Sequence, residues 1–193
     1  MLFVACVPKE NRYSLSEERL FGIANLDEIV EKIRNDLKLR SSSISISFSF
    51  KGDYMDDISP FVKELMELVL TETGEPDEGD YIRYQIGGYE VRYQAKERLT
   101  KYTHTIRILP TYYTTADEER EVDARVSDAV AEILEETEET VQIIRAVHDY
   151  ICRNVTYDTV HKSGNFSHIG ATAYSALHYG TASCQGYAVL TYR

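Results

Sequence analysis

Cys184 is the residue of this sequence whose setting most suggests covalent chemistry. It follows a Thr-Ala-Ser run and opens an apolar stretch that predicts a helix with the thiol in its first turn. Free backbone N–H groups at a helix N-terminus favour negative charge and would stabilise a thiolate nucleophile. Gly186 is costly inside a helix, which suggests that another group passes close to its backbone. From spacing alone, a small buried cysteine is the favoured interpretation and a nucleophile the alternative.

The five histidines do not form a recognisable site. His104 lies in a predicted strand and His148 beside the apolar stripe of a predicted helix, so we expect both to be structural. His161, His168 and His178 fall in a region rich in Ser, Gly and Asn. No two histidines have the i, i+4 helical spacing of a zinc site, so we predict neither a metal nor a cofactor.

The other two cysteines, Cys6 and Cys152, receive no catalytic role. Three cysteines are an odd number and show no C-x-x-C spacing, so at least one thiol stays free. The glycine-rich motifs that bind nucleotide phosphates are absent from the sequence.

Two separate blocks around Cys184 resemble the bacterial transglutaminase-like superfamily. The first block is HDYICRNVTYD, from His148 to Asp158; the second comprises AYSAL, from Ala173, and SCQGYA, from Ser183. The similarity covers about residues 139–193, and the two blocks are in order and at plausible spacing around one cysteine.

The resemblance implies a papain-like core in which Cys184 heads the central helix and is the nucleophile of a Cys-His-Asp triad. Tyr157 and Asp158 correspond to a segment for which structural roles are expected. Ser183 departs from the residues common before the cysteine. The implied substrate is a protein or peptide, a cell-wall peptide being one option, and a secreted or cell-surface location is favoured. The implied histidine and aspartate would follow Arg193, so we expect this chain by itself to be inactive or nearly so.

A non-catalytic interpretation remains open. In it, the N-terminal residues recognise a protein or cell-wall partner, and the cysteine region is a degenerate transglutaminase-like domain that serves as a scaffold. The sequence alone does not separate transglutaminase, protease and inactive forms, because the first two share an acyl-enzyme step.

The composition argues against some classes of binding partner. The 193 residues have a net charge of −11, which argues against nucleic acid or anionic lipid as the main partner. Residues 117–139 hold eleven acidic residues and two arginines, and so carry −9 of this charge. We interpret them as a solvated helix face, with an acidic docking surface as the alternative. No apolar run approaches twenty residues, so no membrane span is predicted.

The periodicity predicts an α+β protein with a domain boundary near residue 116. Residues 1–115 form a small N-terminal α+β domain, and residues 116–193 the helical first part of the transglutaminase-like domain. In the first domain we expect helices over 26–39 and 57–70 and strands over 41–50, 81–94 and 102–113, with a bulge or tight turn at the Gly87-Gly88 pair.

Two helices are expected between residues 116 and 154. The first has the apolar positions Val122, Val126, Val130 and Ile133, and the second has Val141, Ile144, Val147, Ile151 and Val155. We expect the last residues of the chain to be either poorly ordered or docked on Ile144, Val147 and Ile151.

Overall fold

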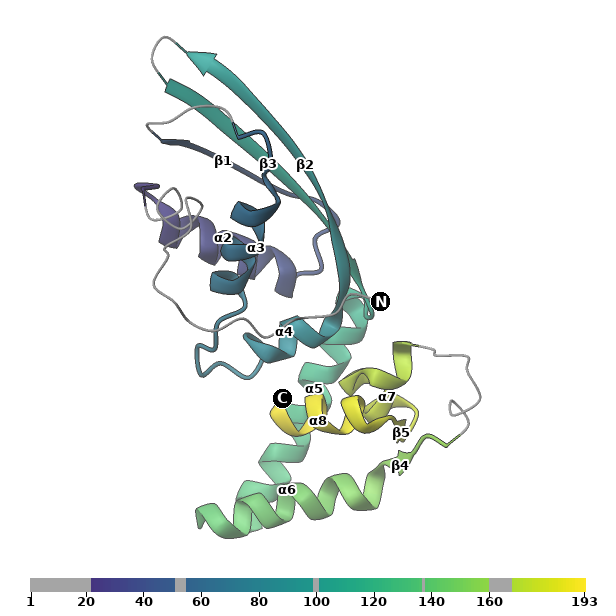
Figure 1. Cartoon of the computed structure of the whole chain (residues 1–193). Helices are drawn as coiled ribbons and strands as arrows, with labels where there is room; N and C mark the ends of the chain where they lie inside the picture. Colours follow the sequence, from purple (N-terminus) through teal and green to yellow (C-terminus); the bar gives the residue numbers. More distant parts are fainter. Residues whose placement is uncertain (1–21, 51–54, 99–100, 137, 160–167) are drawn as a thin grey trace, which may run out of the picture.

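The fold combines a three-stranded antiparallel sheet with helices, and it is mixed α+β as predicted (Figure 1). The computed structural model describes residues 22–50, 55–98, 101–136, 138–159 and 168–193, so Cys6, His161 and the side chain of His168 lie outside the described part. In chain order the elements are α2 (Leu26–Lys38), β1 (Ile44–Phe50), α3 (Ser59–Val69), α4 (Asp80–Gln85), β2 (Ile86–Arg98), β3 (Lys101–Tyr112), α5 (Ala116–Glu136), α6 (Thr140–Asn154), β4 (Thr156–Tyr157), η2 (His168–Ala171), α7 (Ala173–His178), β5 (Thr181–Ala182) and α8 (Cys184–Tyr192).

The sheet has β3 in its centre, between β1 and β2. Alternation in the Ser-Ile repeat of β1 places Ile44 and Ile46 on the buried face, opposite Ile108 and Ile106 of β3. Phe48 continues this face and stacks on His104, with 5.5 Å between the ring centroids. The serines of β1 lie on the exposed face, as their period predicts.

Helices α2 and α3 cover the apolar face of the sheet (Figure 1). Their buried positions recur at helical spacing, so each helix presents one apolar stripe to the strands; these are Ile29, Ile33 and Leu37 in α2 and Phe61, Val62, Leu65, Met66 and Val69 in α3. Pro60 lies in the first turn of α3, where its missing N–H has no helical partner to lose.

The predicted strand beginning at Tyr81 is wrong in its first part, because residues 80–85 form helix α4. Tyr81, Ile82 and Gln85 are all buried. In the helix, Ile82 packs in the apolar cluster under the sheet, whereas Tyr81 packs in the cluster that contains Val122 of α5. The strand starts only at Ile86, and the register shift there confirms a bulge at the Gly87-Gly88 pair.

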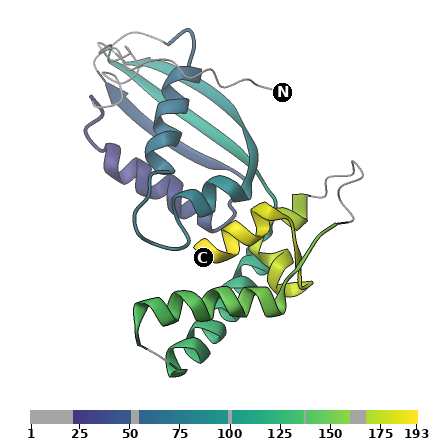
Figure 2. The ribbon, with the colours of Figure 1, turned by 60° about the horizontal axis from the view of Figure 1, so that its bottom comes forward.

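The second part of the chain is helical, with α5 and α6 as an antiparallel pair and α7 and α8 packed on them (Figure 2). Its apolar cluster is separate from that under the sheet and contains Val122, Ile151, Val155, Val189 and Leu190 together with Tyr81 of α4. The domain boundary near residue 116 stays a prediction. No helix in the described ranges combines the length and apolar character that crossing a membrane requires.

The predicted apolar stripe of α6 is buried only toward its C-terminal end. Ile151 is buried, whereas Val141 and Ile144 are 62% and 65% exposed. Val130 of α5 is exposed as well, although Val122 on the same stripe is fully buried. Ile133, beyond Val130 in α5, is buried again, so the periodicity identified the helices correctly but not which positions of each stripe are buried.

A buried ion pair joins the end of α2 to the start of α5. The guanidinium of Arg40 lies 2.8 Å from the carboxylate of Glu119, and the two side chains are only 4% and 11% exposed. Tyr81 and Thr114 donate hydrogen bonds to the same carboxylate, at 2.8 and 2.5 Å. Burial and the Glu119 charge raise the pKa of Tyr81, so its phenol stays a proton donor. Glu119 is thus an exception to the predicted solvated acidic face.

We predict that Glu119→Gln destabilises the chain by about 3–5 kcal/mol, because it leaves Arg40 buried without a counter-charge. Urea unfolding followed by circular dichroism measures the change. The matched control is Glu132→Gln on the exposed side of the same helix, which should stay within about 0.5 kcal/mol of the parent chain. Equal effects of the two substitutions would contradict a role for the buried pair.

Candidate functional site

Cys184 is the first residue of helix α8, as predicted, and its side chain is exposed. The interpretation as a small buried cysteine is therefore wrong. Ser183 holds the N-cap position with extended backbone angles, but its side chain makes no capping hydrogen bond. The first-turn N–H groups beside the thiol are not satisfied by that side chain, which leaves a positive helix end next to Sγ.

Two short parallel strands set the position of the residues before the thiol. β4 pairs with β5, and the N–H of Asp158 donates to the carbonyl of Ala182 at 2.9 Å. The N–H of Ser183 donates to the carbonyl of Gly170 at 2.8 Å. The backbone is thereby held on both sides immediately ahead of Cys184.

Gly186 lets the backbone of α8 lie directly on the η2–α7 segment. A Cβ atom at this position would come within 2.6 Å of the carbonyl oxygen of Gly170 and 2.8 Å of Cβ of Ala182. It would also lie 3.3 Å from the carbonyl oxygen of Thr172. The close approach that the sequence suggested is therefore present, and two of the three atoms are backbone carbonyl oxygens, which cannot move aside cheaply.

The side chain of Tyr187 connects α8 to the segment after α6. Its hydroxyl donates to the carbonyl of Val155 at 2.5 Å, and its ring stacks on Tyr157 with 6.2 Å between centroids. The two sequence blocks on either side of residues 159–172 are thus in direct contact.

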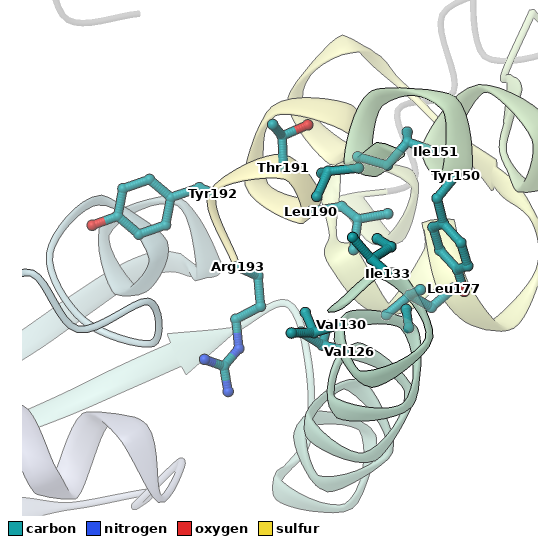
Figure 3. A pocket seen from close by; sticks show the side chains of 12 residues that line it. Val126, Val130, Ile133, Tyr150, Ile151, Leu177, Leu190, Thr191, Tyr192 and Arg193 are labelled. Carbon is teal, nitrogen blue, oxygen red and sulfur yellow. The ribbon is translucent and has the colours of Figure 1, made fainter. Parts of the chain in front are cut away.

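The last turns of α8 are ordered and docked rather than loose. Val189 and Leu190 are buried in the same cluster as Ile151, and Val147 packs against this cluster. Ile144 remains exposed and takes no part, so the predicted docking surface is correct for two of its three residues. An open apolar pocket of about 250 Å³ remains between α5, α6 and α8 (Figure 3).

The other side of α8 forms hydrogen bonds with α4 and with the loop that precedes α4. The Gln185 amide donates to the carbonyl of Tyr84 at 3.2 Å. The Tyr192 hydroxyl donates to the carboxylate of Glu72. Arg193 lies over the ring of Tyr81, 5.2 Å from its centroid, and forms an ion pair with an aspartate of α5.

The three histidines whose side chains are described all have partners other than Cys184. His104 is buried and accepts or donates a 2.7 Å hydrogen bond with Tyr93, which fits its expected structural role. His178 lies 2.8 Å from Glu121 and stacks on Tyr174. Within the described part of the chain, no hydrogen bond joins a histidine to the Cys184 thiol.

His148 is not the packed structural histidine that the sequence suggested, because its side chain is 72% exposed. Its Nε2 lies 3.5 Å from Sγ of Cys152, one helical turn further along α6. The spacing of the histidines alone does not reveal this contact between a histidine and a cysteine. The i, i+4 spacing of a histidine and a cysteine was the signal in the sequence that could have found it.

No protein-family model matches this chain, and comparisons with curated proteins and with solved structures give no match either.

Gly186→Ala should destabilise the chain, although alanine is favoured over glycine in a helix by about 1 kcal/mol. The clash with the Gly170 carbonyl outweighs that gain, and overpacking of this kind costs about 1–3 kcal/mol. Thermal unfolding measures the net effect. Ala188→Gly at an exposed position of the same helix is the control, with an expected loss of about 1 kcal/mol from propensity alone. A stabilised Gly186→Ala protein would show that the close packing is not maintained.

The Tyr192–Glu72 hydrogen bond should make stability depend on pH in two windows. This hydrogen bond, followed by burial, raises the pKa of Tyr192 to about 12. The stability it contributes is therefore complete below the unfolded value of about 10 and is lost as the pH rises toward 12. The same bond, with the Asp80 N–H, lowers the pKa of Glu72, so that contribution is lost as the pH falls through the folded value.

Tyr192→Phe should reduce the loss of stability between pH 10 and 12, to which Tyr112 also contributes, and raise the pKa of Glu72 toward its ordinary value. Denaturation at stepped pH and carboxyl NMR titration of Glu72 measure the two effects. Tyr84→Phe, at an exposed tyrosine of α4, is the control. An unchanged Glu72 titration in Tyr192→Phe would exclude the hydrogen bond.

Proposed function

We propose that this chain is part of a transglutaminase-like, cysteine-dependent acyl-transfer or peptide-hydrolysing protein with Cys184 as its nucleophile. The observation that carries the proposal is the exposed thiol at the first position of α8. A structural cysteine would be expected inside the packing, whereas here Gly186, two residues later, makes the close contact and leaves the thiol accessible.

The local packing supports the same proposal. The two sequence blocks that resemble the family are held together through Tyr187, Tyr157 and the β4–β5 pair. Such contacts fix the start of α8 relative to the preceding loop. A nucleophile needs this kind of positioning, because small displacements of reacting atoms cost much of the rate.

The chemistry proposed is a two-step acyl transfer. The thiolate adds to the carbonyl of a peptide or glutamine side-chain amide, the C–N bond breaks, and ammonia or an amine leaves with a proton. The resulting thioester then passes its acyl group to an amine or to water, and the thiol is restored. Departure of the amine needs a proton donor, and the described histidines have other partners. We therefore propose that this chain by itself turns over amides slowly or not at all.

An activated ester tests the nucleophile without requiring that proton donor. With p-nitrophenyl acetate, the thiolate displaces p-nitrophenolate, which leaves without protonation, and a thioester remains on the protein. We expect Cys184 to be acetylated faster at pH 7 than N-acetylcysteine, by up to about threefold, because the helix N-terminus favours the thiolate while its nucleophilicity falls by less. Release of p-nitrophenolate and mass mapping of the acetylated peptide give the rate and the position.

Cys184→Ser should abolish the fast phase, and Cys152→Ser should retain it. Circular dichroism of both variants, which replace exposed side chains, checks that the fold is kept. Acetylation of Cys184 no faster than that of the free thiol would overturn the proposal and favour a non-catalytic binding or scaffold protein.

A further inference from the structure

The exposed face of α6 carries a second group of side chains that the proposed acyl transfer does not use. His148 and Cys152 lie one turn apart, and both are exposed. Their facing atoms, Nε2 and Sγ, are 3.5 Å apart. Residues at i and i+4 point to the same side of a helix, so the backbone itself holds this spacing.

Asp149 determines which nitrogen of His148 carries the proton. Its carboxylate lies 3.1 Å from Nδ1 of the imidazole, and an ionised carboxylate can only accept a hydrogen bond. Nδ1 therefore carries the hydrogen in the neutral ring, and Nε2 directs its lone pair at the thiol of Cys152. In this arrangement the thiol proton lies between two potential metal ligands.

The distance between the two atoms is the one that a tetrahedral metal site requires. Zinc binds thiolate sulfur at about 2.3 Å and imidazole nitrogen at about 2.0–2.1 Å, so two such ligands at a tetrahedral angle are about 3.5 Å apart. A cation can therefore replace the thiol proton without a change in this distance, once the imidazole turns so that its lone pair points to the metal rather than to the sulfur. The Asp149–Nδ1 contact corresponds to the carboxylate–histidine–zinc arrangement that orients metal-bound imidazoles.

We propose that His148 and Cys152 form a two-ligand chelate for a zinc-type divalent cation, oriented by Asp149. The described residues contain no group of three or more potential ligands, so within this part of the chain the pair supplies two positions and water or an added ligand supplies the others. Binding exchanges one proton for the metal: the S–H bond breaks, a metal–sulfur bond forms, and the proton passes to solvent. Thiolate and imidazole select zinc-type ions over Mg²⁺ and Ca²⁺, which prefer oxygen ligands. The net charge of −11 favours the approach of any cation.

Co²⁺ is a direct probe of this chelate, because its bonds to thiolate give near-ultraviolet charge-transfer absorption and its visible bands report tetrahedral geometry. The full chain, reduced and freed of reductant, is titrated with Co²⁺ and then with Zn²⁺. We expect both absorptions to appear with Co²⁺ and to disappear when Zn²⁺ displaces it. An excess of Mg²⁺ should leave them unchanged.

Variants identify the ligands. Cys152→Ser and His148→Gln should each abolish the charge-transfer band, and Asp149→Asn should weaken Co²⁺ affinity by about 10- to 100-fold, the usual loss for a group that orients a metal-bound histidine. Cys184→Ser, Cys6→Ser and His178→Gln should keep the band. Circular dichroism controls for folding. Absence of the band in the parent chain, or its survival in Cys152→Ser or His148→Gln, would overturn the proposal. Because Cys184→Ser removes acyl transfer but not the chelate, failure of one proposal is distinguishable from failure of the other.

Discussion

The buried carboxylate of Glu119 is the interaction on which the arrangement of the two parts of the chain depends. A lone charge at this depth would be strongly unfavourable, so its partners must be present together. Arg40 neutralises it, while Tyr81 and Thr114 use its remaining lone pairs. These residues come from the end of α2, from α4, and from the segment after β3. One carboxylate at the start of α5 therefore holds together three segments that are distant in sequence.

The position of helix α8 depends on the contacts around Glu119. The ring of Tyr81, oriented by its hydrogen bond to Glu119, lies under the guanidinium of Arg193 at the end of α8. At the other end, Gly186 rests on the η2–α7 segment. The helix is held at both ends by polar and backbone contacts and in the middle by Val189 and Leu190. The thiol of Cys184 is exposed because the groups that pack the helix lie on its other sides.

The two exposed thiols of the described chain have different surroundings, and this suggests different chemistry. Cys184 lies beside backbone N–H groups at a helix end, without a described side-chain partner, which suits a nucleophile. Cys152 lies in the C-terminal half of a helix, facing an imidazole whose proton is placed by a carboxylate. That arrangement suits metal coordination, because the nitrogen lone pair and the sulfur already converge. Neighbouring groups, rather than the thiol itself, decide the difference.

Local patterns in the sequence determined the α+β class, the Ser-Ile strand, the α5–α6 pair, and the start of a helix at Cys184, because periodicity and helix-end chemistry act over a few residues. The same patterns failed at Tyr81, where burial against α5 outweighs strand propensity, and along α6, where Ile144 is largely exposed. The facing of His148 and Cys152 follows from their i, i+4 spacing in one helix, whereas the exposure of Cys184 and the burial of Glu119 were decided by the tertiary structure. Each depends on which groups surround a side chain in space, and a linear pattern carries that information only where the helix repeat brings neighbours together.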